Sequence, residues 1–283
     1  RLNSKLLASD VTRFKMIVDY GIICLVCCAV LLSNCSVNSQ SANMIPLENG
    51  KNECVILLHG LGRTYHSMDK MQKALTQAGF HTVNLNYPSR KESIEQLAAN
   101  YIPSAIEQCQ DYAPDQIHFV THSLGGIVTR MALKQQRPEN LGRVVMLSPP
   151  NSGSEAADVL QKNWFYSWAN GPSGQQLSTS SDSVPNQLGP VDYPVGIITG
   201  DRQTFFDSWV ASLFSDTDGE KVFEGANDGK VSVERAKLAG MTDFIVVHEN
   251  HSFIMRSKQV QFQTIEFLNN EAFLHDNSSI KKD

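Results

Sequence analysis

Short apolar segments recur along the chain and predict the strands of a sheet. Residues 54–58 read Cys-Val-Ile-Leu-Leu, an unbroken apolar run that is typical of a strand buried on both faces. Residues 82–87 alternate between apolar and polar positions, which also indicates a strand. Four more segments have strand character: 116–120, 144–147, 195–199 and 244–247.

Between these segments, apolar residues recur at helical spacing. A helix is predicted from Ser67 to Gly79, and a second begins after Ser93, where Gln96 completes a capping box. Residues 124–135 and 260–268 predict two further helices. Strands that alternate with helices imply a parallel sheet covered on both faces, so the sequence predicts an α/β fold.

The first 35 residues are typical of a targeting segment rather than of a folded domain. Arg13 and Lys15 precede an apolar run of 12 residues, 21–32, which is too short to span a bilayer but fits the core of a secretory signal. The run ends in Leu-Ser-Asn-Cys, which resembles a bacterial lipobox, although Asn34 stands where a small residue is usual. Residues 1–35 are therefore predicted to be a signal peptide or a lipoprotein signal, with an uncleaved anchor as the alternative.

This segment sets the expected location of the protein. Export to the bacterial cell envelope follows from a signal of this kind, either as a free periplasmic protein or as one attached to the membrane through Cys35. Residues 36–52 are then a linker, 53–270 the folded domain and 271–283 a polar tail.

Composition and charge narrow the function. Hydrophobic residues make up 41% of the chain and charged residues 19%, as in an ordinary globular protein. The net charge is −5, and it becomes −7 without residues 1–35, which hold four basic and two acidic residues. An acidic chain has no basic surplus to neutralise phosphates, which argues against nucleic acid as a partner.

The cysteines do not indicate a metal site. Cys24, Cys27 and Cys28 lie in the apolar run with no histidine beside them, so they are not expected to bind a metal. Cys54 and Cys109 in the folded domain either pair, as an exported protein allows, or stay as buried free thiols. We expect free thiols, because spacing alone does not bring the two side chains together.

One strand–turn–helix junction carries the strongest chemical signal. Residues 121–126 read Thr-His-Ser-Leu-Gly-Gly and join the strand at 116–120 to the next helix. A serine in so sharp a turn holds its hydroxyl clear of the backbone, as a catalytic nucleophile requires. Gly125 supplies the small residue needed where strand and helix pass closely, while Thr121 replaces the glycine that is usual on the strand side. Ser123 is therefore the candidate nucleophile.

Together with His59-Gly-Leu-Gly62 at the end of the first strand, this junction resembles the α/β-hydrolase superfamily, and within it the bacterial lipases and esterases. The similarity runs from about Glu53 to Leu268. It implies a mostly parallel central sheet, a cap-like insertion at about 151–190 and a triad in the order serine, acid, histidine. It also implies an oxyanion hole formed by the backbone N–H groups of Leu61 and Leu124.

Two aspartates compete for the role of the triad acid. Asp228 lies in Asn-Asp-Gly-Lys-Val-Ser-Val, which resembles the N-D-G-x-V-x-V acid loop of lipases. Asp201 directly follows the strand at 195–199, which is also a suitable position. The motif and its spacing to the following histidines favour Asp228, and Asp201 is the alternative.

Two histidines follow the last strand, and either could serve as the base. His248 continues the strand at 244–247, so its ring is expected to project from the sheet. His251 lies further along the loop, where it can reach Ser123. His251 is therefore the predicted base.

These roles predict a serine hydrolase that cleaves small-molecule or lipid esters through an acyl-enzyme, with no metal or organic cofactor. Aromatic clusters at 164–168 and 205–214 either line an acyl pocket, meet lipid or pack internally. They do not separate a lipase from an esterase, a thioesterase or an amidase. An acyltransferase on the same triad and a non-catalytic envelope lipoprotein are the alternative functions.

Overall fold

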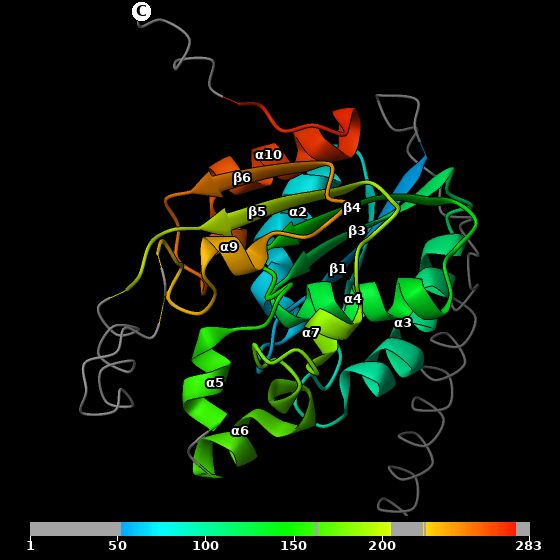
Figure 1. Cartoon of the computed structure of the whole chain (residues 1–283). Coiled ribbons are helices and arrows are strands. Elements are labelled where there is room, and N and C mark those ends of the chain that lie inside the picture. Colours follow the sequence, from blue (N-terminus) through cyan, green and yellow to red (C-terminus); the bar gives the residue numbers. More distant parts are fainter. Residues whose placement is uncertain (1–51, 162–163, 205–222, 224, 276–283) are drawn as a thin grey trace, which may run out of the picture. The chain divides into compact units, whose positions relative to one another are not determined.

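Six parallel strands form one sheet in the order β2-β1-β3-β4-β5-β6 (Figure 1). This computed structural model describes residues 52–161, 164–204, 223 and 225–275. The parallel sheet that the sequence predicts is confirmed. The strands are β1 (Glu53–Leu58), β2 (His81–Leu85), β3 (Gln116–His122), β4 (Leu141–Leu147), β5 (Val195–Gly200) and β6 (Asp243–Val247).

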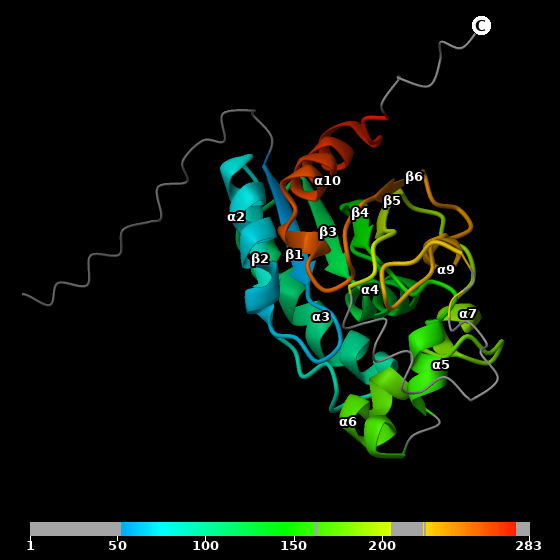
Figure 2. The same ribbon diagram turned by 90° about the vertical axis from the view of Figure 1, so that its left-hand side faces the viewer.

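Helices cover both faces of the sheet (Figure 2). One face carries α3 (Ile94–Gln110) and α4 (Leu124–Gln135), and the other carries α2 (Asp69–Gln77) and α10 (Lys258–Asn270). Short helical turns lie in the connections outside these helices: η1 (Tyr65–Met68), α9 (Val233–Ala236) and η2 (Ile254–Arg256).

The residues of β1 explain why both faces are covered. Cys54, Ile56 and Leu58 pack in one hydrophobic cluster with side chains of α3 and α4. The alternate residues Val55 and Leu57 pack in a second cluster with side chains of α2 and α10. Because successive side chains of a strand point to opposite faces, an unbroken apolar run needs a helical layer on each side.

Local signals predicted the helices well. The capping box of α3 is present, with Ser93 Oγ accepting from the N–H of Gln96 and the Gln96 side chain accepting from the N–H of Ser93. The helix predicted from Ser67 begins instead as the 3-10 turn η1 and becomes α-helical at Asp69. The strand predicted at 82–87 is shifted and ends at Leu85.

The two cysteines of the folded domain form a disulfide, so the expectation of free thiols is wrong. Cys54 lies on β1 and Cys109 near the end of α3, and their Cα atoms are 5.8 Å apart. Both side chains belong to the core cluster between the sheet and α3. The pairing depends on how α3 docks on β1, which a sequence separation of 55 residues does not reveal.

The segment between β4 and β5 is helical where the sequence gives no clear element. It holds α5 (Glu155–Gln161), α6 (Trp164–Gln175) and α7 (Val184–Gln187), and we call residues 151–190 the insertion. The aromatic side chains at 164–168 and 205–214, and Cys35 with the whole of 1–51, lie outside what the structure describes.

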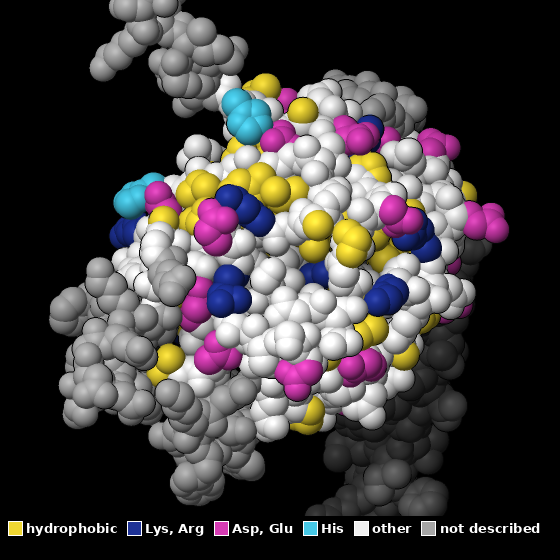
Figure 3. All heavy atoms as spheres, viewed as in Figure 1, with side chains coloured by type: hydrophobic (Ala, Val, Ile, Leu, Met, Phe, Trp, Pro, Cys, Tyr) yellow, Lys and Arg dark blue, Asp and Glu magenta, His cyan; other side chains and the backbone are white. Residues whose placement is uncertain are grey.

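The described surface shows no charge segregation on the face seen in Figure 3. Its Lys and Arg side chains are interspersed with Asp and Glu side chains. A mixed face of this kind does not resemble the basic stripe that follows a nucleic-acid backbone.

Candidate active site

Ser123 occupies a strained turn between β3 and α4. Its φ is 54° and its ψ is −122°, a conformation that residues other than glycine rarely adopt. Gly125 allows this turn, because a Cβ there would lie 2.9 Å from the carbonyl oxygens of Leu58 and His59. The turn therefore directs the Ser123 side chain away from the strand and toward the loops at the carboxyl end of the sheet.

Thr121 fits where a glycine is usual, because its side chain finds room on the far side of the turn. Its Oγ1 faces Gly126, where a Cβ would lie 3.3 Å away, and it donates a long hydrogen bond of 3.5 Å to the carbonyl of Val145. Gly126 thus supplies on the helix the space that a small residue on the strand would otherwise provide.

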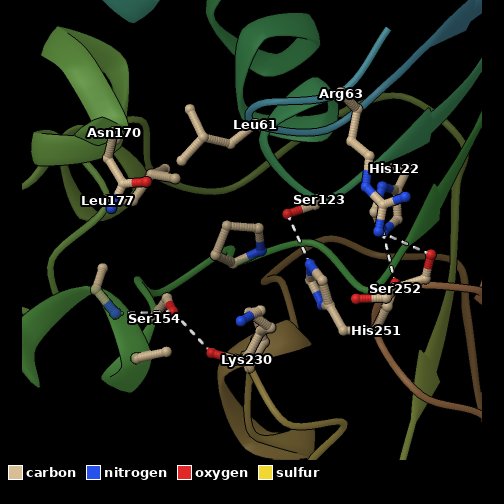
Figure 4. A pocket seen from close by; sticks show the side chains of 15 residues that line it. Leu61, Arg63, His122, Ser123, Ser154, Asn170, Leu177, Lys230, His251 and Ser252 are labelled. Atoms are coloured by element: carbon tan, nitrogen blue, oxygen red, sulfur yellow. Dashed lines mark hydrogen bonds between the residues drawn. The ribbon is translucent and has the colours of Figure 1, made fainter. Parts of the chain in front are cut away.

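Three side chains predicted from separate segments form one hydrogen-bonded chain. Nε2 of His251 lies 3.0 Å from Oγ of Ser123, and Nδ1 of His251 lies 2.9 Å from Oδ2 of Asp228. Asp228 is fully buried and His251 is 7% exposed. Figure 4 shows the Ser123 hydroxyl and the His251 ring pointing toward each other. The imidazole is thus placed to accept a proton from the serine while the carboxylate holds its other nitrogen.

The loop around Asp228 fixes the carboxylate. Oδ1 accepts the backbone N–H groups of Lys230 at 3.0 Å and Val231 at 2.9 Å, which leaves Oδ2 for His251. Burial alone would raise the pKa of Asp228. The positive charge and hydrogen bond of His251, with the N–H of Val231, outweigh burial and lower this pKa below its ordinary value. Asp228 is therefore ionised at neutral pH.

The two alternative candidates, Asp201 for the acid and His248 for the base, contact each other and not Ser123. Nδ1 of His248 lies 2.9 Å from Oδ1 of Asp201 at the ends of β6 and β5. The His248 side chain is 79% exposed. Within the described residues, this surface pair does not join the Ser123–His251–Asp228 chain.

The loop after β1 passes close to Ser123, because a Cβ at Gly60 would lie 3.2 Å from the Cβ of Ser123. The N–H of Arg63 donates to the carbonyl of Gly60 at 3.2 Å and closes a turn around Leu61 and Gly62. Gly62 has a φ of 67°, and its N–H donates to Oγ of Ser89 at 3.0 Å. This geometry fixes the loop that carries the Leu61 amide.

The second predicted donor comes from the start of α4. Leu124 is the first residue of this helix, so its N–H has no carbonyl partner within the helix. The amide of Leu124 is therefore available beside Ser123, as an oxyanion donor must be.

A pocket beside Ser123 is lined by the loops that follow β1 and β6, by the loop at 230–231 and by the insertion (Figure 4). Asn170 and Leu177 from the insertion lie on one side, Arg63 and Ser252 on the other, and Ser123 between them. The other described residues that line it are mostly small or apolar: Leu61, Pro150, Ser154, Ala156, Ala157, Gly174 and Val231, with His122, Lys230 and His251.

The middle of the insertion contacts the loop between β2 and α3 and the first residue of α3. Ser173 Oγ donates to the carbonyl of Ser89, and the side chain of Gln176 accepts from the N–H of Ile94 at 2.7 Å. Gly171 packs against the backbone of Arg90, where a Cβ would clash. Ser89 therefore contacts both the insertion and the loop of Gly62.

Sequence reasoning missed two side chains at this site. His122 and Arg63 both donate to the loop that carries His251, at 2.9 Å and 3.1 Å. Neither residue is singled out by the sequence. Both contacts join residues more than a hundred positions apart, so no local pattern signals them.

The residues that the structure describes contain no group of three or more His, Cys, Asp or Glu side chains arranged to hold a metal ion. None of the helices described is both long and apolar enough to cross a membrane.

Comparison with known proteins agrees with this fold. The family model described as alpha/beta hydrolase fold matches residues 53–194, and no curated protein matches the chain. The mature lipase BlEst2 of Bacillus licheniformis has a TM-score of 0.58 at 17% identity, over 78% of this chain and 92% of that one.

Two other solved structures are similar at the level of the fold. The phospholipase PlaB of Legionella pneumophila has a TM-score of 0.57 at 16% identity, over 78% of this chain and 60% of that one. Lipase B of Aspergillus fumigatus has a TM-score of 0.55 at 16% identity, over 85% of this chain and 57% of that one. The family match spans half of the chain and includes β1 to β4 with Ser123, so this chain belongs to the alpha/beta hydrolase fold family.

Proposed function

We propose that the protein is a serine hydrolase that cleaves carboxylic esters. The observation that carries this proposal is the continuous hydrogen-bonded chain from Ser123 through His251 to Asp228, of which Ser123 and His251 line a pocket. The family match and the fold-level similarity to lipases support it. Because those proteins are named lipases, we include lipid esters among the proposed substrates of this chain.

The mechanism follows from the positions of these groups. His251 takes the proton of Ser123 as Oγ attacks the acyl carbonyl, and Asp228 stabilises the imidazolium that forms. The amides of Leu61 and Leu124 donate to the oxygen that becomes negative, each contributing on the order of 10²–10³ in rate. His251 then gives its proton to the leaving alcohol, which departs and leaves the acyl group on Ser123.

Water completes the cycle by the reverse sequence. His251 removes a proton from the water as it attacks the acyl-enzyme, the acyl–serine bond breaks, and Ser123 regains its proton from His251. The residues proposed here accomplish both halves with no metal or organic cofactor.

A fluorophosphonate probe tests the proposal. We expect it to label Ser123 in the wild-type chain and to leave Ser123→Ala unlabelled, while both proteins melt at similar temperatures. A series of p-nitrophenyl esters of increasing acyl length then defines the substrate class. A wild-type chain that neither reacts with the probe nor turns over any ester contradicts the proposed function.

We also propose that the protein works outside the cytoplasm. The Cys54–Cys109 disulfide supports this location, because such bonds persist in oxidising compartments. Fractionation of the native cells and mass spectrometry of Cys35 test export and lipidation. Recovery of the unprocessed chain from the cytoplasm would contradict both.

A further inference from the structure

The loop that carries His251 is held along its backbone by three other parts of the site. We call residues 248–253 the histidine loop. The N–H of His251 donates to the carbonyl of Asp228 at 3.0 Å. The carbonyl of His251 accepts from Nε2 of His122 at 2.9 Å, and the carbonyl of Ser252 accepts from Nη2 of Arg63 at 3.1 Å.

These contacts bind the histidine loop to the segments that supply the other catalytic groups. His122 directly precedes Ser123, and Arg63 closes the turn that contains Leu61. We propose that His122 and Arg63 are positioning residues, which hold two successive carbonyls of the histidine loop and so fix the His251 ring between Ser123 and Asp228. This inference rests on the proposed role of His251 as the base.

His122 is suited to this task because its ring is buried and its donor is defined. Nε2 faces a carbonyl oxygen, which only accepts, so Nε2 must carry the proton. Nδ1 has no hydrogen-bond partner among the described residues and faces Gly60, where a Cβ would lie only 2.8 Å away. The ring is therefore a neutral donor with a single hydrogen bond, and it lies 4.9 Å from the His251 ring without competing for its proton.

Arg63 links the histidine loop to the other side of the pocket. Its backbone N–H closes the turn at Gly60, while its guanidinium reaches across to Ser252. One residue therefore sets the distance between the loop that presents the Leu61 amide and the loop that presents His251. A displacement of about 1 Å between reacting groups can cost about 10²-fold in rate, so a small loosening of this link has a measurable effect.

The test pairs a variant that removes each donor with one that keeps it. We expect His122→Met and Arg63→Met to lower kcat for p-nitrophenyl esters by about 10- to 100-fold with little change in KM. We expect His122→Gln and Arg63→Lys, which retain a donor, to recover most of this loss. Arg137→Met is the matched control, because Arg137 pairs at the surface with Asp192, outside the histidine loop.

A second readout does not depend on turnover. We expect the proton between Nδ1 of His251 and Oδ2 of Asp228 to give a low-field proton NMR line, because the two atoms lie 2.9 Å apart. We expect this line to weaken or shift in both Met variants but not in Arg137→Met. Thermal melting of each variant separates this effect from unfolding. Wild-type kcat and an unchanged line in both Met variants would overturn the inference.

The two proposals fail in different ways. If the wild-type chain cleaves no ester and Ser123 stays unlabelled, the proposed function fails. The low-field line then still shows whether His122 and Arg63 fix the position of the histidine loop. If the wild-type chain is active and the Met variants equal it, the proposed function stands and the positioning role is wrong.

Discussion

Asp201 and His248 form a hydrogen-bonded pair, with Oδ1 of Asp201 2.9 Å from Nδ1 of His248, directly after β5 and β6. In the sequence, Asp201 is the alternative to Asp228 as the triad acid, and His248 is the alternative to His251 as the base. Their pairing gives both a partner on the surface, and it leaves Asp228 and His251 to contact one another in the pocket.

This arrangement predicts a sharp difference between two pairs of variants. Asp228→Asn keeps the shape of the side chain but removes the charge that stabilises the His251 imidazolium, so we expect kcat to fall by about 10⁴-fold. Asp201→Asn and His248→Asn disturb only an exposed pair, and we expect kcat to stay near the wild-type value. Steady-state rates with a p-nitrophenyl ester measure both. A greater loss in Asp201→Asn than in Asp228→Asn would exchange the two assignments.

The turn at Ser123 makes a second prediction about neighbouring glycines. A Cβ at position 125 would lie 2.9 Å from backbone oxygens that the sheet holds in place, whereas one at position 126 would meet side-chain atoms at 3.3–3.5 Å. We expect Gly125→Ala to lower the free energy of unfolding by about 1–3 kcal/mol and to impair activity, because the backbone must shift. Gly126→Ala is the matched control and should cost less. Urea unfolding gives both values, and equal losses would show that the close contact at Gly125 is relieved without cost.

How much the sequence predicts depends on the range of the interactions involved. The turn at Ser123 could be predicted because strand, turn and helix follow one another within a few residues, and their small residues are adjacent. The capping box at Ser93 is equally local. The acid and the histidine could be ranked because each lies in a loop that follows a recognisable strand.

Features that depend on the docking of distant elements could not be predicted. Cys54 and Cys109 pair because α3 lies across β1, and no pattern near either cysteine encodes that distance. His122 contacts the backbone of a residue 129 positions away. A hydrogen bond to a backbone carbonyl does not depend on the identity of the acceptor residue, so the sequence near either residue does not indicate this contact.

The buried rings of His122 and His59 make stability depend on pH. Burial is the main cause that lowers the pKa of each ring below 6.5, and the nearby charge of His251 lowers that of His122 further. Below pH 6.5 the unfolded chain therefore binds protons that the native state does not. The free energy of unfolding should therefore decrease as the pH is lowered below 6.5, by at most about 1.4 kcal/mol per pH unit for each ring.

His122→Gln isolates one of these two contributions. Glutamine does not titrate, so we expect the pH slope of the unfolding free energy below pH 6.5 to become smaller than that of the wild-type chain. Urea unfolding at several pH values between 5 and 7.5 measures the slopes, which matter more here than the absolute stabilities. An identical slope in the variant would mean that His122 is protonated as readily in the native state as in the unfolded chain.

The disulfide between β1 and α3 should contribute to the stability of the fold and not to the chemistry at Ser123. The bond between Cys54 and Cys109 closes a loop with a sequence separation of 55, and in the loop-entropy model such a cross-link stabilises the native state by about 4 kcal/mol. We expect the double variant Cys54→Ala/Cys109→Ala to unfold at lower urea concentration by roughly this free energy while keeping the turn at Ser123 intact. Dithiothreitol should destabilise the wild-type chain in the same direction and leave the double variant unchanged. A wild-type chain whose unfolding is insensitive to reductant would show that the two thiols are not joined in solution.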